Sequence, residues 1–334
     1  MTGYHSATAT ERLGTESGDI ASAATILAGG DLVAFPTETV YGLGADGRNS
    51  RAVAALYAAK ERPQFNPLIA HVATTEAATR EGLFDADASR LAQAFWPGPL
   101  TLVVPVSGTC SVCDLARAGL DSVGLRVPAH PAASALLAAC GFPVVAPSAN
   151  RSGRVSPTEA EHVLGDLEGR IRAVLDGGST RVGVESTIVA CLGGPPRLLR
   201  PGGVPREAVE AILGRPLGEA GPSGVKPLAP GALASHYAPR ALVRLEARDV
   251  RFGEAALSYG PDLPGEAVAQ LNLSPAADLN EAAANLFGYL RRLDATGPET
   301  IAVATIPNTG LGEAINDRLR RAAADRDADP TSSA

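Results

Sequence analysis

Residues 32–67 read LVAFPTETVYGLGADGRNSRAVAALYAAKERPQFNP, and this stretch decides which fold the sequence predicts. It opens with an apolar run that Pro36 interrupts, which predicts a strand. Asn49 is a favourable N-cap, so we expect a helix to begin there and to end before Pro63, which cannot continue it. The strand and the helix bring hydroxyl groups, glycines and the cations Lys60 and Arg62 together, and that combination suits a phosphate-bearing ligand.

The length and net charge of the chain limit the classes of protein to which it can belong. The chain has 334 residues, enough for two domains, and a formal net charge of −7. This charge argues against a general nucleic-acid binder, although a local basic cleft is compatible with it. No apolar run reaches the length of a membrane span, and residues 1–19 lack the apolar core of a signal peptide. We therefore expect a cytoplasmic protein with no membrane contact.

The cysteines and lysines are few. Cys110 and Cys113 form a CxxC pair, but a zinc site needs a second pair or histidines at matching spacing, and neither follows. We interpret the pair as two free thiols in a loop and expect no protein-bound metal. Among 29 lysines and arginines only Lys60 and Lys226 are lysines, which makes Lys60 notable.

Apolar runs and helical periods alternate over the first two thirds of the chain. Strands are expected at residues 32–35, 67–73, 100–106, 122–127, 143–147, 173–175 and 186–190, and helices at 20–27, 49–62, 88–96, 132–140 and 205–213. Ser156, followed by Pro157 and Glu159, predicts another helix with serine as its cap. Residues 1–16 have the composition of a disordered segment. The alternation predicts an α/β fold with a mixed or largely parallel sheet.

A second unit is expected after a linker. Residues 214–234 are rich in Gly, Pro and Ala, and a smaller α/β pattern of about ninety residues follows, which is enough for a core. We therefore predict domains at 17–213 and 240–325, joined by a linker at 214–239.

The end of this linker differs from a passive tether. Lys226 to Gly231 contains two prolines, and His236 and Tyr237 form an aromatic pair before the second unit. Stiff backbone and aromatic side chains suit a lid that lies across a cavity, with Tyr237 near a nucleotide. The alternative is that His236 and Tyr237 only begin the core of the second domain.

Gly42, Gly44 and Gly47 satisfy the GxGxxG pattern of dinucleotide-binding turns, so an NAD(P)-dependent oxidoreductase has to be considered. Six residues separate the predicted strand from the first glycine, and the next strand does not end in the acidic residue that would hold a ribose. These features weigh against the oxidoreductase, which stays as an alternative.

The other interpretation is a ligand site formed by cations and hydroxyl groups from several parts of the chain. Strand ends and helix starts are where α/β proteins bind ligands and phosphates, and several such side chains fall there: Lys60, Arg62, Arg126, Arg200, Ser148, Ser156 and Ser186. Arg126 lies between Leu125 and Val127 in a predicted buried strand, so it needs an anionic partner. His71 lies in another predicted strand, where a hydrogen-bonded structural role is common.

Nine short motifs in fixed order carry a family resemblance. They are FPTETVYGLG (35–44), KERPQFNPL (60–68), WPGPLT (96–101), GLRVPAHP (124–131), APSAN (146–150), SPT (156–158), DGG (176–178), GVESTIV (183–189) and LLRPG (198–202). Together they resemble the YrdC-type threonylcarbamoyl-AMP synthases. APGALASHYAP (229–239) and the unit after it resemble the longer, two-domain branch. The resemblance implies an open, twisted α/β sheet domain with a positively charged cavity, followed by a smaller Rossmann-like α/β domain.

The resemblance also implies a reaction. The family joins L-threonine, bicarbonate and ATP into threonylcarbamoyl-adenylate and releases pyrophosphate. The product serves a tRNA-modifying transferase complex, which forms threonylcarbamoyladenosine beside the anticodon of tRNAs that read ANN codons. Mg²⁺ is expected on the phosphates of ATP. Direct contact with the tRNA is left open.

The resemblance implies a role for each matching side chain. Lys60 and Arg62 would be catalytic. The nucleotide would be held by Arg62, Asn66, Ser122, Ser148, Ser156, Arg200 and Tyr237. The threonine pocket would be formed by Thr37, Thr39, His71, Arg126, Ala146 and Ser186. The rival classes are a carbamoyl transferase, whose additional zinc-finger and acylphosphatase-like regions this chain lacks, and a double-stranded RNA-binding module.

Overall fold

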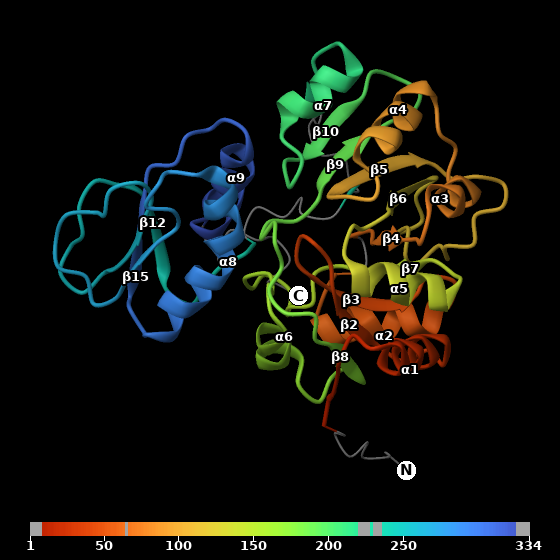
Figure 1. The fold of residues 1–334 in the computed structure, drawn as a ribbon, viewed down its shortest axis with the longest axis horizontal. Helices are drawn as coiled ribbons and strands as arrows, with labels where there is room; N and C mark the ends of the chain where they lie inside the picture. Colours follow the sequence, from red (N-terminus) through yellow and green to blue (C-terminus); the bar gives the residue numbers. More distant parts are fainter. Residues whose placement is uncertain (1–8, 64–65, 220–227, 230–235, 325–334) are drawn as a thin grey trace.

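The computed structural model describes residues 9–63, 66–219, 228–229 and 236–324. Within these residues the chain forms one sheet of eleven strands and a second of four (Figure 1). We call the two parts the large-sheet domain and the small-sheet domain. The predicted α/β fold class is confirmed.

The large sheet is mixed, with the strand order β1-β8-β2-β3-β7-β4-β6-β5-β9-β10-β11. Its strands are β1 (Glu11–Leu13), β2 (Val33–Pro36), β3 (Tyr41–Asp46), β4 (Ile69–His71), β5 (Leu100–Pro105), β6 (Ser122–Arg126), β7 (Val144–Val145), β8 (Ala173–Leu175), β9 (Thr187–Ala190), β10 (Arg197–Arg200) and β11 (Gly218–Glu219). The helices of this domain are α1 (Ser17–Ala28), α2 (Ser50–Lys60), α3 (Thr75–Glu81), α4 (Ala86–Phe95), α5 (Pro131–Cys140), α6 (Ala160–Leu167) and α7 (Arg206–Leu213).

Alternating side chains of β2 serve two apolar cores. Val33 and Phe35 pack in the core that contains residues of α1 and α5, whereas Ala34 belongs to the core that contains residues of α2. Because successive side chains of a strand point to opposite faces, a four-residue apolar strand fits a sheet covered on both sides. The sheet is therefore buried in the middle, and polar side chains reach a ligand only where strands end.

Two of the three glycines of the GxGxxG pattern lie in a strand, and Gly47 lies in the turn that follows this strand. Gly42 and Gly44 belong to β3, which pairs antiparallel with β2. A Cβ on Gly44 would lie 3.0 Å from side-chain atoms of both Phe35 and Val144, so this glycine permits close packing. The pattern therefore has a packing role, and the dinucleotide-binding interpretation is not favoured.

Two other local predictions need correction, and one helix was missed. Disorder was expected for residues 1–16, but Glu11–Leu13 forms β1 and pairs in parallel with β8, while residues 1–8 lie outside the described part. Ser156 does not cap a helix, because α6 begins at Ala160 with Glu159 in the cap position. Helix α3 was not expected at all.

The small-sheet domain is an all-parallel α/β unit with the strand order β12-β15-β13-β14. It consists of β12 (Leu242–Ala247), β13 (Ala255–Ser258), β14 (Gln270–Asn272), α8 (Leu279–Ala295), β15 (Thr300–Ala304) and α9 (Leu311–Ala322). Helices α8 and α9 lie on the side of the small sheet that faces the large-sheet domain (Figure 1). Side chains of these two helices can therefore reach the other domain.

The domain limits remain predictions. The large sheet takes in β1 and β11, which lie outside 17–213, and much of 214–239, including Lys226, lies outside the described residues. None of the helices in the described part of the chain is long and apolar enough to cross a membrane.

Candidate functional site

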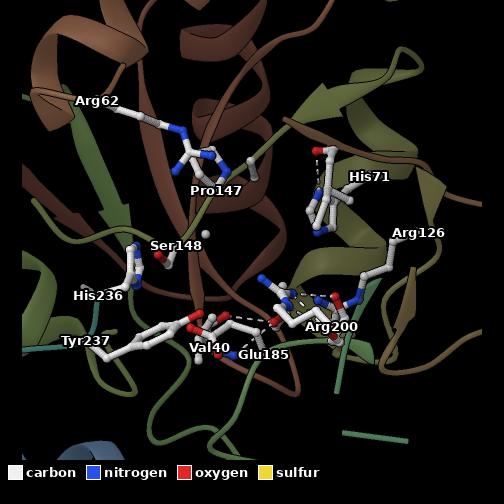
Figure 2. Close-up of a pocket in the computed structure, with 15 residues that line it drawn as sticks. Val40, Arg62, His71, Arg126, Pro147, Ser148, Glu185, Arg200, His236 and Tyr237 are labelled. Atoms are coloured by element: carbon white, nitrogen blue, oxygen red, sulfur yellow. Dashed lines mark hydrogen bonds between the residues drawn. The ribbon is translucent and has the colours of Figure 1, made fainter. Parts of the chain in front are cut away.

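One cavity gathers side chains from seven distant segments of the large-sheet domain and from His236 and Tyr237 (Figure 2). Nine of its lining residues were predicted as site residues: Thr37, Arg62, His71, Arg126, Ala146, Ser148, Ser186, Arg200 and Tyr237. Eight of them follow or end strands β2, β4, β6, β7 and β10, precede β9, or follow helix α2, and Tyr237 lies between the two sheets in sequence. The sheet topology therefore brings strand ends together at one place, as α/β ligand sites require.

Arg126 has an anionic partner within the protein. Its Nη2 donates to Glu38 Oε1 at 2.7 Å, and its Nε donates to the carbonyl of Gly98 at 3.3 Å. The Glu38 carboxylate also accepts from the backbone N–H of Ala129. Burial raises the pKa of Glu38, but the charge and hydrogen bond of Arg126 outweigh this and lower it overall. Since a guanidinium has five N–H donors, Arg126 retains donors for a second carboxylate.

Arg200 is held by neutral acceptors. Its Nη2 donates to the carbonyl of Ser186 at 2.9 Å and to Ser186 Oγ at 3.2 Å, and its Nε donates to the same carbonyl. Ser186 Oγ also pairs with Thr101 Oγ1 at 2.8 Å. Burial lowers the pKa of Arg200, although Tyr237 and Glu185 oppose this effect. No ion pair neutralises Arg200 within the described part of the chain, so its charge is available to an anionic ligand.

Arg62 is the second such cation. It projects into the cavity from beyond the end of α2, opposite Glu185 and Tyr237 (Figure 2). Its Nη2 reaches the carbonyl of Pro67 at 3.5 Å, and its buried Nε has no partner among the described residues. Burial lowers its pKa to about 10. An anion would supply the missing partner.

Glu185 lines the cavity and was missed, although it lies in the quoted segment GVESTIV. Its Oε1 accepts from Ser156 Oγ at 2.6 Å and its Oε2 accepts from Arg318 Nε of α9 at 2.8 Å. Burial raises the pKa of Glu185, but Arg318 and then Arg200 lower it to about 2 overall. The lowered pKa keeps Glu185 ionised near neutral pH, and Ser156 lies behind the wall as its hydrogen-bond donor.

Lys60 also lies behind the wall. It is 1% exposed, and its Nζ donates to the carbonyl oxygens of Ser148, at 2.5 Å, and of Asn150. Burial lowers the pKa of Lys60 well below its usual value, and Arg62 adds to this effect. Ser148 does line the cavity, and its Oγ donates to Asn150 Oδ1. The lysine therefore shapes the loop that carries Ser148, and a surface location for Lys60 is ruled out.

The remaining predicted residues divide between the cavity and its surroundings. Thr37 Oγ1 lies 2.8 Å from Thr39 Oγ1, but only Thr37 lines the cavity. His71 Nδ1 lies 3.2 Å from the carbonyl of Ile69, and burial lowers the pKa of His71 to about 3. Ala146 lines the cavity, but its N–H already donates to that same carbonyl, which leaves its own carbonyl for a ligand.

Asn66 and Ser122 lie outside the cavity. Asn66 is buried, and its Oδ1 has no partner among the described residues. Ser122 lines a smaller, adjacent cavity that shares Ile69 with the main one.

The aromatic pair at the end of the linker forms part of the wall. Tyr237 is 1% exposed, stacks on Phe287 of α8 with ring centroids 5.5 Å apart, and has the Arg318 guanidinium 5.3 Å from its ring centre. His236 also lines the cavity, and burial lowers its pKa to about 3. Tyr237 thus belongs to the core of the small-sheet domain and to the cavity wall at once. Most of the expected lid, 220–227 and 230–235, lies outside the described residues.

The cavity has room for about 50 Å³ of free volume as it stands. Ligand pockets for drug-sized molecules usually measure about 300–1,000 Å³. The enclosed free volume is therefore below that range.

Known proteins resemble both parts of the chain. A family model described as "Telomere recombination" matches residues 25–202, and one described as "Threonylcarbamoyl-AMP synthase, C-terminal domain" matches residues 204–324. The chain is 41% identical to the threonylcarbamoyl-AMP synthase of Bacillus subtilis over 95% of this chain and 96% of that protein. It is also 41% identical to the Pyrococcus abyssi synthase over 92% and 94%. The crystal structure of P. abyssi Sua5 complexed with L-threonine matches with a TM-score of 0.87 at 38% identity, over 95% of this chain and 98% of that one.

Proposed function

The chain belongs to the threonylcarbamoyl-AMP synthase family, as its motifs indicated, and on that premise we propose that the cavity between Arg62 and Arg200 is where the reaction takes place. L-Threonine and bicarbonate combine there to a carbamate with loss of water. A carbamate oxygen attacks the α-phosphorus of ATP, the bond to the β-phosphate oxygen breaks, and pyrophosphate leaves. The products are threonylcarbamoyl-adenylate and pyrophosphate.

The observation that carries this assignment is the imbalance of charge in the cavity. Three arginines line it, and Arg126 is paired with Glu38 whereas Arg62 and Arg200 have no acidic partner among the described residues. A triphosphate and a threonine carboxylate are anions that such a cavity can bind. Phosphoryl transfer needs positioning and charge neutralisation more than covalent catalysis, and fixed guanidinium groups provide both.

We assign the residues by what their free atoms can reach. Arg62 and Arg200 neutralise phosphates and the charge that develops on the leaving pyrophosphate. The remaining donors of Arg126 bind the threonine carboxylate, and Thr37, His71 and the carbonyl of Ala146 shape the pocket around it. Lys60, Thr39 and Ser156 act one layer back, where they hold Ser148, Thr37 and Glu185 in place.

Mg²⁺ enters this proposal as part of its ATP complex. Phosphate oxygens and water are ligands that Mg²⁺ prefers. Glu185 is the one acidic side chain among the described lining residues, and both of its oxygens already accept hydrogen bonds. The metal would therefore be held mainly by the phosphates, and it would help to neutralise their charge.

The product's use follows from its chemistry. A mixed anhydride of a carbamate and a phosphate is a reactive acyl donor, so an enzyme that transfers the group to tRNA must receive it promptly. We propose that this transferase complex works with the protein in the cytoplasm, and that direct contact with tRNA is optional for formation of the adenylate.

The test is an incubation with ATP, bicarbonate and L-threonine, followed by measurement of pyrophosphate and of the adenylate. We expect pyrophosphate release to depend on threonine, and Arg200→Gln to abolish most of it. Arg197→Gln is the matched control, because Arg197 lies on the same strand β10 outside the cavity lining. Release that is equal without an amino acid, or equal loss in both variants, would refute the proposal.

A further inference from the structure

Glu185, the one carboxylate among the described lining residues, lies close to two arginines. Arg200 contacts the residue next to Glu185, and Arg318 contacts Glu185 itself. No ion pair joins Glu185 to Arg200 in the described structure, although Arg200 is close enough to lower the pKa of Glu185. Glu185 could therefore pair with Arg200 or with Arg318. In the structure it pairs with Arg318, which does not line the cavity.

Arg318 comes from the other domain, and its Nε and Nη1 have acidic partners, whereas its buried Nη2 has none among the described residues. It lies on α9, is 0% exposed, and donates from Nε to Glu185 Oε2 at 2.8 Å and from Nη1 to Asp317 Oδ2 at 2.7 Å. Burying an arginine is costly unless it is paired, so this contact is a built feature of the domain interface.

We propose that Arg318 of the small-sheet domain is a positioning residue that engages Glu185 and thereby leaves Arg200 unpaired for the phosphates of ATP. Without Arg318, Glu185 would still have Arg200 beside it, because Arg200 is bound to the adjacent Ser186. An ion pair between them would neutralise part of the positive charge that the nucleotide meets. The small-sheet domain would thus set the charge of a cavity whose lining comes mostly from the other domain. This inference rests on the proposed function, because it takes ATP as the anion that Arg200 binds.

The contact of Arg318 with Tyr237 offers a competing explanation for any loss of function. The guanidinium lies over the tyrosine ring, so its removal would also loosen the wall. The two explanations differ in one respect, because only the charge explanation predicts that removing Glu185 as well restores nucleotide binding.

A second ion pair across the domains supplies a matched control. Arg206 of α7 binds Glu313 of α9 with Nη2–Oε1 at 2.7 Å, and neither residue lines the cavity. Arg206→Gln weakens the docking of the same helix without touching Glu185.

The experiment measures equilibrium binding of MgATP to the full chain, together with KM for ATP and for threonine. Arg318→Gln should raise the Kd for MgATP about tenfold or more, since one unit charge at an ion-pair distance can change binding by that factor. KM for ATP should follow, and KM for threonine should change much less. Arg206→Gln should bind MgATP as the wild type does. The double variant Arg318→Gln/Glu185→Gln should return to within about threefold of the wild type, because the two sites are coupled.

Three outcomes would overturn the inference: unchanged binding in Arg318→Gln, equal losses in Arg318→Gln and Arg206→Gln, or a double variant that binds no better than Arg318→Gln. Should Arg318→Gln fail to fold, Glu185→Gln alone decides. It removes the negative charge and should tighten MgATP binding, and weaker binding would refute the inference. A wild-type protein that does not bind MgATP would refute the proposed function itself, and this inference with it.

Discussion

Replacing Arg126 with alanine should damage both the fold and the use of threonine, for separable reasons. Arg126 and Glu38 form an ion pair at 2.7 Å with both side chains at most 4% exposed. Removal of the guanidinium leaves the Glu38 carboxylate buried, with the N–H of Ala129 as its remaining hydrogen-bond donor in the described structure. Breaking a buried pair in this way typically costs about 3–5 kcal/mol of folding free energy.

The pH dependence of that loss has a defined sign. In the wild type, Arg126 holds the pKa of Glu38 below its usual value against the effect of burial. Without Arg126, burial raises the pKa of Glu38 above its unfolded value, so the folded variant binds a proton that the unfolded chain does not. Its stability relative to the wild type should then improve as pH falls from 7 toward 5. Arg126 also helps to lower the pKa of His71, and losing this effect acts in the same direction.

The assay combines urea unfolding with steady-state kinetics. Arg126→Met/Glu38→Gln removes both charges and should recover most of the lost stability, because a buried ion pair can often be replaced without loss. The double variant still lacks the guanidinium, so its KM for threonine should remain about 10- to 100-fold above that of the wild type, from a charged hydrogen bond of about 1.5–3 kcal/mol. A folded double variant with normal KM for threonine, or with a change mainly in KM for ATP, would refute the assignment of Arg126.

Three further predictions follow from buried groups. Lys60→Ala should lower stability by about 1–3 kcal/mol in urea unfolding, because two buried carbonyls lose their donor, and should lower activity through Ser148; wild-type stability would contradict this. His71 and His236, whose pKa values burial lowers to about 3, stay neutral in the folded state and take up protons on unfolding. Unfolding free energy should therefore fall by about 1.4 kcal/mol per pH unit for each as pH drops from 6 to 5, and His71→Gln should remove about half of this slope. Tyr237→Ala should cost about 3–5 kcal/mol, measured in the same way, and should raise KM for ATP, whereas normal values for both would place its ring outside the wall.

Local sequence patterns predicted the secondary structure correctly where a segment's own residues determine it. The N-cap at Asn49 is an example, since its side chain accepts from the N–H groups of Arg51 and Ala52 as the sequence predicts. These patterns gave wrong predictions where residues distant in the sequence determine the local structure. The strand Glu11–Leu13 has mostly exposed side chains and exists because it pairs with Ala173–Leu175, some 160 residues later. Ser156 has the sequence context of an N-cap, but its hydroxyl group donates a hydrogen bond to Glu185 instead.

The lining of the cavity was predicted better than its layers. Motifs named nine residues that line the cavity, but they do not distinguish a side chain in the lining, such as Arg62, from one behind it, such as Lys60. That distinction depends on burial and on which carbonyls lie nearby. Arg318 did leave a signal, because it occupies the buried stripe of α9 beside Ile315 and Leu319, where a cation is unexpected. Its partner could not be inferred, since Glu185 lies 133 residues away.

The two buried carboxylates near the cavity explain how it can hold several cations and still receive anions. Glu38 accepts a hydrogen bond from Arg126 Nη2 and so fixes the plane of the guanidinium group. A second carboxylate binds a guanidinium best when it lies in that plane. Glu185 is engaged by Arg318, so Arg200 is held only by the neutral oxygens of Ser186. Arg62 and Arg200 then repel each other, and this repulsion contributes to lowering the pKa of Arg62. An incoming phosphate relieves the repulsion, whereas a neutral molecule does not. The repulsion between Arg62 and Arg200 would therefore favour anionic ligands in the proposed site.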